Sequence, residues 1–462
     1  MSRLRQARHG PAAQDGAGSM RRLVAVARWP TPAAGRAPRS CRRPLVALAL
    51  LAAVAAGCSD ARPPVGDGAT PVTLAADVEP AEVPSDRRTL TRVDRLTGDM
   101  TPKSVVASGH GLVVAQNMIY THTVSAFSSD GELVATIDDD VVPADHGYDA
   151  WTRSVQGGPV EAAFSRDGSQ LWISNYSMYG PGFPTPGDDD CTPDSGVDPA
   201  FLYRIDPETF QVDDIVLVGA VPKYLEVTPD GRYVVVTNWC TWDASIVATG
   251  ADGSPAREVA RVPIGRYPRG VAISPDSATA YVAVMGGSDI AVVDIEAAVG
   301  SAQEGAQDEA AGDPAGQDRS EADTDADRST PGAQDAVSFL EDVGNGPRHL
   351  VLSPDGTTLY ATLNRDGTVA KVDAATGELL GTVRTGDQPR SAALSPDGTA
   401  LFVVNYESDT VSRVRTSDLT EVETVAVDHH PIGITYDAGT DRVWVAAYGG
   451  SLTVFADGAA AP

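Results

Sequence analysis

Basic and aromatic side chains are both scarce in this sequence. Lys and Arg together number 35 against 63 Asp and Glu, and aromatic residues make up 6% of the 462 positions. The resulting formal charge of −28 at pH 7 repels the phosphates of nucleic acid, so we expect no nucleic-acid binding. The hydrophobic content of 42% is nevertheless that of a globular protein rather than of a disordered one.

Local motifs of several enzyme classes are missing as well. The sequence has no P-loop, no dinucleotide-binding fingerprint, no Ser nucleophile elbow and no CxxCH haem-attachment motif. Asp323, Asp325 and Asp327 are spaced like the start of a calcium loop, but Arg328 stands where such a loop needs Gly. We therefore predict neither a metal nor a cofactor. A catalytic site assembled from distant segments would leave no local motif, so an enzyme is disfavoured rather than excluded.

Long hydrophobic runs are also lacking. The run from Pro44 to Gly57 (PLVALALLAAVAAG) is too short to span a bilayer, but it follows an Arg-rich leader and suits a signal peptide. The small residues 55–57 directly precede Cys58 and resemble a bacterial lipobox, which implies cleavage before this cysteine and a lipid on it. We therefore predict export through a lipoprotein-type signal peptide over residues 1–57.

One position departs from the lipobox pattern. Ala55 stands where Leu is commonest, so plain secretion after cleavage nearby is the alternative to lipidation. Residues 58–87 are rich in Pro, Ala, Asp and Gly and predict a flexible tether. The expected location is the cell envelope outside the cytoplasm, with the lipid as the only membrane attachment.

Internal repeats are the strongest signal in the sequence. PRHLVLSPDGTTLYATLN from Pro347 and PRSAALSPDGTALFVVN from Pro389 are two clear copies, spaced by 42 residues. Seven copies can be aligned on an anchor proline, including weaker ones at each end. The anchor prolines are Pro102, Pro159, Pro222, Pro268, Pro347, Pro389 and Pro431.

Each repeat reads as four short strands, here called a to d. Strand a follows the proline, Asp-Gly provides a tight turn into strand b, and strand c alternates as in TVAKVD from Thr368. Four strands in each repeat of about 40–45 residues are typical of a propeller blade. The last repeat lacks strand d, which the segment Thr89–Arg95 can supply. We predict an all-β fold, a seven-bladed β-propeller over residues 88–457 with a tail over 458–462; eight blades are the weaker alternative.

These copies resemble the YVTN β-propeller repeat family, whose units read like PxGVAxSPDGxxxYVxN. The resemblance covers roughly residues 88–457 and implies a propeller of the kind found in bacterial surface and periplasmic proteins. It implies little about chemistry, because one fold serves many functions.

Two repeats carry insertions. Residues 177–199 extend the b–c connection of the second repeat, and this segment contains Cys191. Cys240 lies at the equivalent turn of the next repeat, so the two cysteines share one face and predict a disulfide; two unpaired thiols are the alternative. Residues 300–336 lengthen a c–d turn and hold ten acidic residues, which predicts a disordered acidic loop.

A basic residue follows the anchor proline in five of the seven repeats. Strand a is innermost in a blade, so these side chains should surround the mouth of the central channel. They could hold a carboxylate or phosphate, for which Arg offers a bidentate fork. Alternatively, the basic residue belongs to the repeat itself and pairs with an acid on a neighbouring blade. The five residues are Lys103, Lys223, Arg269, Arg348 and Arg390.

Aromatic residues gather in the b–c connections on the same face, joined by Tyr224 and Tyr267 after d–a connections. Amphipathic rings suit sugars, peptides or planar ligands, whereas packing between blades is the alternative role. The aromatic candidates are Tyr176, Tyr179, Trp239, Trp242, Tyr406 and Tyr448.

The functional prediction is a non-catalytic binding or scaffold propeller that uses this face. The partner would be a small anionic, sugar or peptide ligand, or another envelope protein. The alternative is a propeller enzyme, either a metal-assisted, lactonase-like hydrolase or a cofactor-dependent oxidoreductase. His349, His429 and His430 are the side chains that would favour it.

Overall fold

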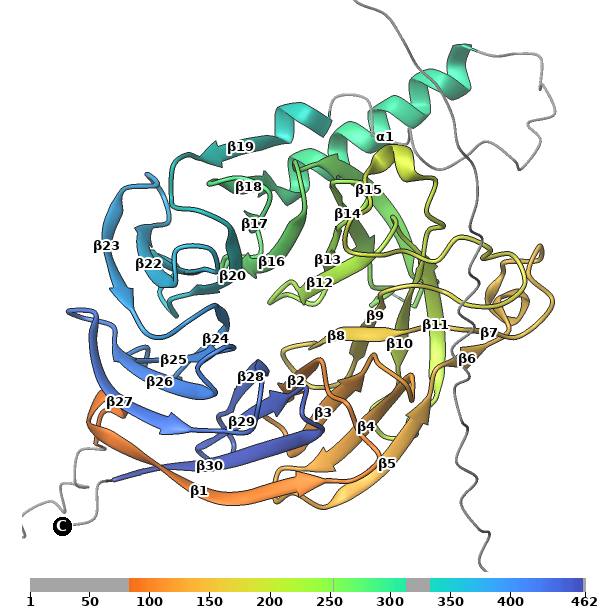
Figure 1. Ribbon diagram of the computed structural model, residues 1–462. Helices are drawn as coiled ribbons and strands as arrows, with labels where there is room; N and C mark the ends of the chain where they lie inside the picture. Colours follow the sequence, from red (N-terminus) through yellow and green to blue (C-terminus); the bar gives the residue numbers. More distant parts are fainter. Residues whose placement is uncertain (1–82, 252, 313–332, 460–462) are drawn as a thin grey trace, which may run out of the picture. The chain divides into compact units, whose positions relative to one another are not determined.

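The repeat units form seven four-stranded antiparallel sheets around a common axis (Figure 1), so the predicted seven-bladed β-propeller is confirmed. The structure is a computed structural model and describes residues 83–251, 253–312 and 333–459. The predicted signal peptide, Cys58 and residues 58–82 of the tether lie outside the described residues. Within the described part, no helix combines the length and the hydropathy that crossing a bilayer requires.

Blades 1 to 6 each follow the chain from the inner strand a to the outer strand d. Blade 1 contains β2 (Ser104–Ala107), β3 (Leu112–Asn117), β4 (Thr123–Ser128) and β5 (Leu133–Asp138). Blade 2 contains β8 (Pro159–Phe164), β9 (Leu171–Asn175), β10 (Phe201–Ile205) and β11 (Val212–Leu217). Blade 3 contains β12 (Pro222–Val227), β13 (Tyr233–Asn238), β14 (Asp243–Ala248) and β15 (Arg257–Pro263).

The second half of the ring repeats this pattern. Blade 4 contains β16 (Pro268–Ile273), β17 (Thr279–Val284), β18 (Ile290–Asp294) and β19 (Val337–Leu340). Blade 5 contains β20 (Pro347–Leu352), β21 (Thr358–Leu363), β22 (Thr368–Asp373) and β23 (Leu379–Arg384). Blade 6 contains β24 (Pro389–Leu394), β25 (Ala400–Asn405), β26 (Thr410–Arg415) and β27 (Thr420–Ala426).

Blade 7 joins the two ends of the propeller. It contains β28 (Pro431–Asp437), β29 (Arg442–Ala447), β30 (Ser451–Ala459) and, as its outer strand, the N-terminal β1 (Arg88–Thr97). β1 pairs antiparallel with β30 from Arg88 to Thr97, with one irregularity. The predicted closure by an N-terminal strand is therefore confirmed, and it removes an open edge from the sheet.

The Asp-Gly turns between strands a and b are built by local hydrogen bonds. In blade 6, Ser395 Oγ donates to the Asp397 carboxylate at 2.6 Å, and the Thr399 amide donates to the same oxygen at 3.1 Å. Gly398 then adopts a φ of 70°, a conformation that glycine reaches without strain. The Ser-Pro-Asp-Gly motif therefore determines where strand a ends and strand b begins.

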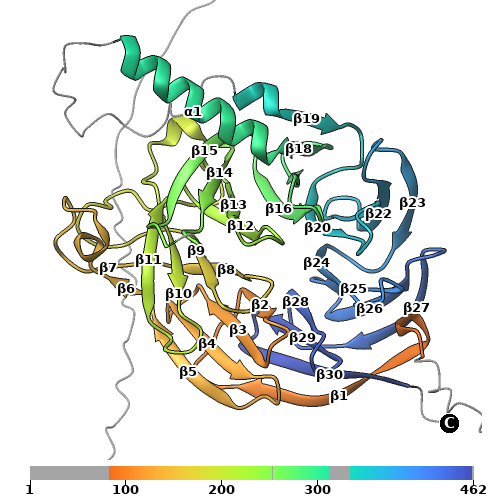
Figure 2. The same ribbon diagram turned by 180° about the vertical axis from the view of Figure 1, so that it is seen from behind.

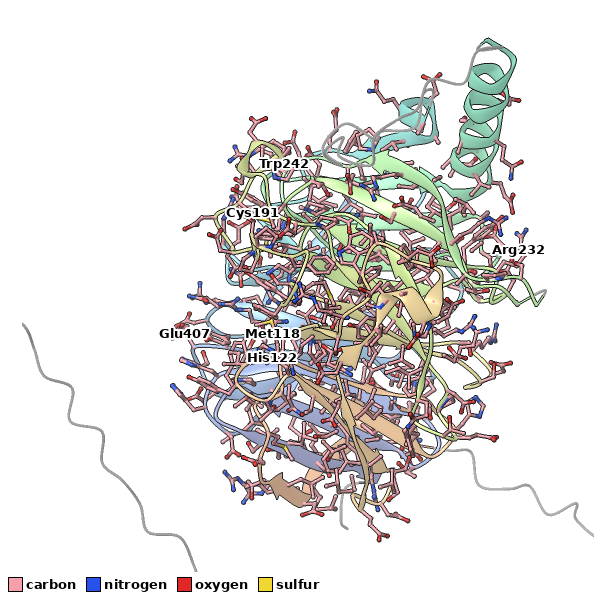
Figure 3. The ribbon with its side chains drawn as sticks, turned by 90° about the vertical axis from the view of Figure 1, so that its right-hand side faces the viewer. Met118, His122, Cys191, Arg232, Trp242 and Glu407 are labelled. Carbon is pink, nitrogen blue, oxygen red and sulfur yellow. A yellow bond between two sulfur atoms is a disulfide. The ribbon has the colours of Figure 1, made fainter. Side chains whose placement is uncertain are left out.

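The turns and the longer connections lie on opposite faces of the ring. Figure 3 views the ring from its side, with Trp242, Cys191 and Glu407 toward one face and Arg232 toward the other. We call the face with the b–c and d–a connections the loop face. The face with the a–b and c–d turns, where Arg232 follows an Asp-Gly turn, is the turn face.

The connection from blade 1 to blade 2 has structure of its own. It contains the short pair β6 (Asp140–Val141) and β7 (Val155–Gln156), with the 3-10 helix η2 (Pro143–His146) between them. The b–c insertion of blade 2 separates β9 from β10 and includes the 3-10 helix η3 (Pro193–Ser195). A further 3-10 helix, η1 (Ser85–Arg87), precedes β1.

The acidic insertion of blade 4 is not disordered at its start, so that part of the prediction is wrong. Helix α1 spans Ile295–Gly312 and packs beside β15 (Figures 1 and 2), and the 3-10 helix η5 (Ala333–Ala336) leads into β19. Asp294 accepts a hydrogen bond from the Ala297 amide at 2.9 Å, which caps the helix. Ile295, Ala298 and Val299 recur at helical spacing and are buried, while residues 313–332 lie outside the described residues.

Candidate functional site

The basic residues after the anchor prolines meet in a pocket at the loop-face end of the central channel. This pocket, which we call the basic pocket, has a volume of about 300 Å³. All five predicted basic residues line it, together with side chains from the b–c connections. Its lining residues are Lys103, Met118, Tyr176, Asp189, Lys223, Trp239, Arg269, Met285, Arg348, Arg390, Ile432 and Tyr448.

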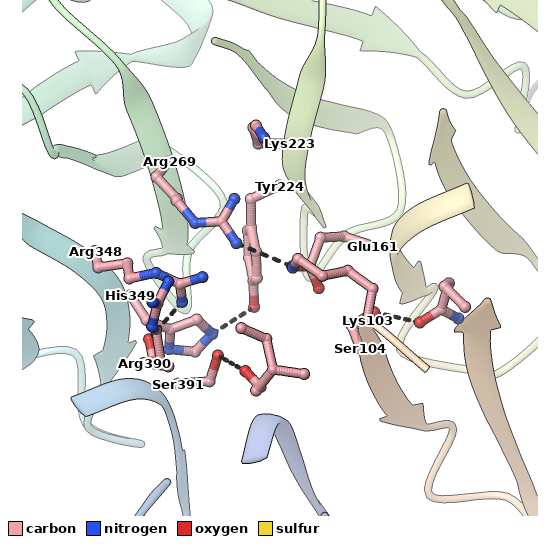
Figure 4. A network of polar contacts seen from close by, with 12 residues as sticks. Lys103, Ser104, Glu161, Lys223, Tyr224, Arg269, Arg348, His349, Arg390 and Ser391 are labelled. Atoms are coloured by element: carbon pink, nitrogen blue, oxygen red, sulfur yellow. Dashed lines mark hydrogen bonds and ion pairs between the residues drawn. The ribbon is translucent and has the colours of Figure 1, made fainter. Parts of the chain in front are cut away.

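Three of the five cations have an acidic partner, and Figure 4 shows the two that share Glu161, namely Lys103 and Arg269. Glu161 on β8 accepts from Lys103 Nζ at 3.0 Å and lies 3.5 Å from Arg269 Nη2, although Arg269 belongs to the non-adjacent blade 4. Lys223 Nζ donates to the Asp189 carboxylate at 2.6 Å. These three cations therefore match the alternative prediction, in which the basic residue belongs to the repeat and pairs with an acid.

Arg348 and Arg390 differ from the other three. Arg348 is 4% exposed, and its Nη1 donates to the backbone oxygen of Arg390 at 2.9 Å. Arg390 donates to the amide oxygen of Gln388 at 2.9 Å, and its buried Nε has no hydrogen-bond partner among the described residues. No carboxylate in the described part of the chain forms an ion pair with either guanidinium. The pocket therefore holds two cations that form no ion pair within the described part of the chain.

Burial and mutual repulsion shift the pKa values of this cluster. Burial lowers the pKa of Lys103 to about 7 and that of Lys223 to about 8, although Glu161 and Asp189 oppose the shift. Burial also lowers the pKa of Arg348 well below its usual value, with the charges of Arg269 and Arg390 acting in the same direction. The cluster thus has more positive charge than its own carboxylates compensate.

Polar side chains from several blades meet in the channel below the basic pocket. His349 Nε2 and Tyr224 Oη lie 3.1 Å apart, although they come from blades 5 and 3. Gly270 of the blade between them makes this possible, because a Cβ there would come within 2.8 Å of the His349 Cα. We call these three side chains, Tyr224, His349 and Glu161, the polar plug. Burial lowers the pKa of His349 to about 3, so its ring is neutral at physiological pH.

Three of the six aromatic candidates line the basic pocket, namely Tyr176, Trp239 and Tyr448. A fourth, Tyr406, lies against it, since its ring centre is 4.2 Å from the Arg390 Cζ.

The other two candidates lie away from the pocket. Tyr179 stacks on His122 at 5.1 Å between ring centres, and Trp242 meets Tyr267 edge-on at 6.0 Å. These two residues therefore pack against other rings on the loop face, and neither lines the basic pocket.

Sequence reasoning missed two methionines and two acids in or beside this pocket. Met118 and Met285 directly follow strand b of their blades, the position that holds Trp239 in blade 3. Comparing this position across the repeats would have found them. Glu161 and Asp189 gave no such signal, because their partners lie on other blades.

The disulfide fixes the insertion that carries Asp189. Cys191 and Cys240 are joined, with their Cα atoms 5.2 Å apart. The Trp239 indole donates to the backbone oxygen of Asp189 at 3.1 Å, and Tyr176 Oη donates to its carboxylate at 3.0 Å. These contacts hold the Asp189 carboxylate over Lys223.

Removing this disulfide should weaken the fold. The two cysteines are 49 residues apart, so restriction of the unfolded chain contributes about 4 kcal/mol to stability. Replacing both cysteines with Ala should lower the free energy of unfolding by about this amount. Urea denaturation with and without reductant measures it. An unchanged midpoint in the double variant would show that the cross-link adds nothing to the native state.

His429 and His430 on the loop face contact other side chains of that face. His429 Nδ1 lies 3.0 Å from an Asp409 carboxylate oxygen, and His430 stacks on Tyr406 at 4.2 Å between ring centres. Among the residues that the structure describes, no group of three or more His, Cys, Asp or Glu side chains is placed to hold a metal ion.

Comparisons with known proteins identify the fold but no family. No protein-family model and no curated protein matches the chain. Among solved structures, Kuenenia stuttgartiensis hydrazine synthase is similar with a TM-score of 0.54 and 15% identity, over 78% of this chain and 96% of that one. At this identity the likeness supports the propeller fold and says nothing about activity.

Proposed function

We propose that this protein is a non-catalytic binding propeller whose basic pocket takes a small organic carboxylate. Arg348 and Arg390 carry the proposal, because they are cations without a counter-anion at the mouth of the channel. A buried charge that lacks a partner costs free energy, and an anionic ligand would remove that cost on binding. Guanidinium groups also match the planar, two-oxygen geometry of a carboxylate.

The rest of the lining favours a ligand with an apolar or planar body. Met118, Met285, Ile432 and Tyr448 contribute apolar or aromatic surface around the charged groups. Met side chains adapt to irregular ligand shapes and contact aromatic rings favourably. A carboxylate attached to a ring or a short hydrocarbon chain would therefore use both parts of the pocket.

The proposed setting is the outer side of the cytoplasmic membrane or the periplasm. It is supported by the apolar run that ends at Gly57 and by the small residues before Cys58. A lipid on Cys58 would attach the propeller through the segment 58–87. Mass spectrometry of the chain released from envelope fractions would identify the lipid.

Benzoate should bind this protein, and benzyl alcohol should not. The two probes have a similar ring, but only benzoate supplies a negative charge for Arg348 and Arg390. At a ligand concentration of 100 times Kd, binding should raise the free energy of unfolding by about 2.7 kcal/mol. Isothermal titration and thermal unfolding measure both effects. Equal affinity for the two probes, or no binding of benzoate, would contradict an anion site.

A further inference from the structure

The central channel has a second cavity below the polar plug. This cavity, which we call the turn-face chamber, has a volume of about 430 Å³ and is lined by strand a of every blade. It extends to Ser108 and Ser165, where the a–b turns of the turn face begin. The chamber shares no lining residue with the basic pocket, and the three residues of the polar plug line the chamber.

One carboxylate stands out in the wall of this chamber. The fourth residue after the anchor proline is uncharged in six of the seven blades, and it is Glu226 in blade 3. No hydrogen bond or ion pair reaches the Glu226 carboxylate from the residues that the structure describes, and the side chain lines the chamber. The six uncharged residues are Val106, Ala163, Ala272, Val351, Ala393 and Thr435.

The titratable groups around Glu226 do not neutralise it. Tyr224 precedes it on the same strand, Glu161 and His349 face the chamber from blades 2 and 5, and Arg166 lines the chamber at its outer end. Burial raises the pKa of Glu226 to about 7. A cation that enters the chamber would stabilise the ionised form of this carboxylate.

The turn face is suited to attract cations. Five of the a–b turns present an aspartate, one of which, Asp230, is paired with Arg232 at 2.6 Å. Local hydrogen bonds keep such residues ionised. Hydrogen bonds from Ser165 and Ser169 lower the pKa of Asp167 to about 2, and a hydrogen bond from Ser353 lowers that of Asp355. A ring of fixed negative charge at one opening raises the local concentration of cations. These turn residues are Asp167, Asp230, Asp276, Asp355 and Asp397.

We propose that the turn-face chamber binds a small organic ammonium ion, whose N–H groups donate to the Glu226 carboxylate. The small apolar residues at equivalent positions, such as Ala272 and Ala393, would contact its hydrocarbon part. A divalent metal ion is a poorer fit, since it needs several oxygen ligands and Glu226 supplies one carboxylate. The propeller thus has an anion site at one end of its channel and an ammonium site at the other.

The test uses n-butylammonium as the probe and n-butanol as its neutral counterpart. At pH 8 and constant ionic strength, isothermal titration should show binding of n-butylammonium alone. Glu226→Gln should weaken it at least about tenfold, whereas Glu226→Asp, which keeps the charge, should retain most of the affinity. Arg348→Gln is the matched control, because it changes the basic pocket and should leave this binding unchanged.

The pH dependence gives a second readout. The alkylammonium stays charged near neutral pH, whereas Glu226 gains a proton as the pH falls through about 7. Affinity should therefore fall about tenfold between pH 8 and pH 6 in the unmodified protein, but not in Glu226→Gln. Lys103 also titrates in this pH window. A pH dependence that persists in Glu226→Gln would therefore come from Lys103 and not from Glu226.

Three outcomes would overturn the proposal: no binding of n-butylammonium, equal binding of n-butanol, or unchanged affinity in a Glu226→Gln variant that unfolds cooperatively. Benzoate binding tests the basic pocket, so the proposals for the two sites can be refuted independently of each other.

Discussion

Replacing Arg348 with Gln should strongly weaken benzoate binding and also stabilise the ligand-free protein. Arg348 is 4% exposed, and the charges of Arg269 and Arg390 add to the cost of keeping it ionised. Removing one buried member of a charge pair in a complex costs about 2–5 kcal/mol, so affinity should fall by about 30-fold or more. In the free protein the same change removes an uncompensated charge, which should add about 1–3 kcal/mol to stability.

Arg269→Gln is the control for this prediction. Arg269 occupies the same position after its anchor proline, but it lies 3.5 Å from the Glu161 carboxylate, which is 7% exposed. Its removal leaves Glu161 with Lys103 alone, so the free protein should lose stability. Urea denaturation should show a higher free energy of unfolding for Arg348→Gln and a lower one for Arg269→Gln. If Arg348→Gln destabilised the protein as much as Arg269→Gln, the Arg348 charge would already be compensated within the fold.

The blades could be predicted because the turns within each repeat are formed by residues that are close in the sequence. Ser395, Asp397 and Gly398 form a turn from residues within four positions of each other, so the motif alone places the hairpin. The closing strand could also be predicted, since the last repeat lacks strand d and a strand-like segment precedes the first repeat at Pro102. Helix α1 was missed because the many acidic residues of the insertion suggested disorder, whereas Asp294 caps the helix and Ile295 packs against the core.

The basic pocket could be predicted only in part. Five cations at one repeat position predicted the ring, because equivalent residues of a propeller surround one axis. Which cations are paired could not be predicted, because Glu161 reaches across the channel to Arg269 and Asp189 comes from an irregular loop. Glu226 was not singled out either, although comparing the fourth residue after each anchor proline shows it as the one charged residue at that position.

The second large effect concerns ring closure. Arg413→Met should lower the free energy of unfolding at pH 7 by about 3–5 kcal/mol. The side chains of Arg413 on β26 and Asp457 on β30 are both fully buried, with 2.5 Å between guanidinium and carboxylate. Arg413 also donates to the Ser85 backbone oxygen at 3.0 Å, so it joins blade 6 to blade 7 and to the segment before β1. Its removal would leave the Asp457 carboxylate buried without its closest cation.

Two further variants show whether the buried charge is the cause. Arg384→Met, on β23, removes an exposed pair with Asp387 and should change stability by less than about 1 kcal/mol. Arg413→Met combined with Asp457→Asn should recover most of the loss, because the fully buried Asp457 charge is removed with its partner and the Glu423 carboxylate, 3.4 Å from Arg413, is partly exposed. The deficit of Arg413→Met should also shrink as the pH falls, since protonation of Asp457 removes the same charge. If the double variant were as unstable as Arg413→Met, the effect would come from lost packing, and the ion pair would not be what holds the ring closed.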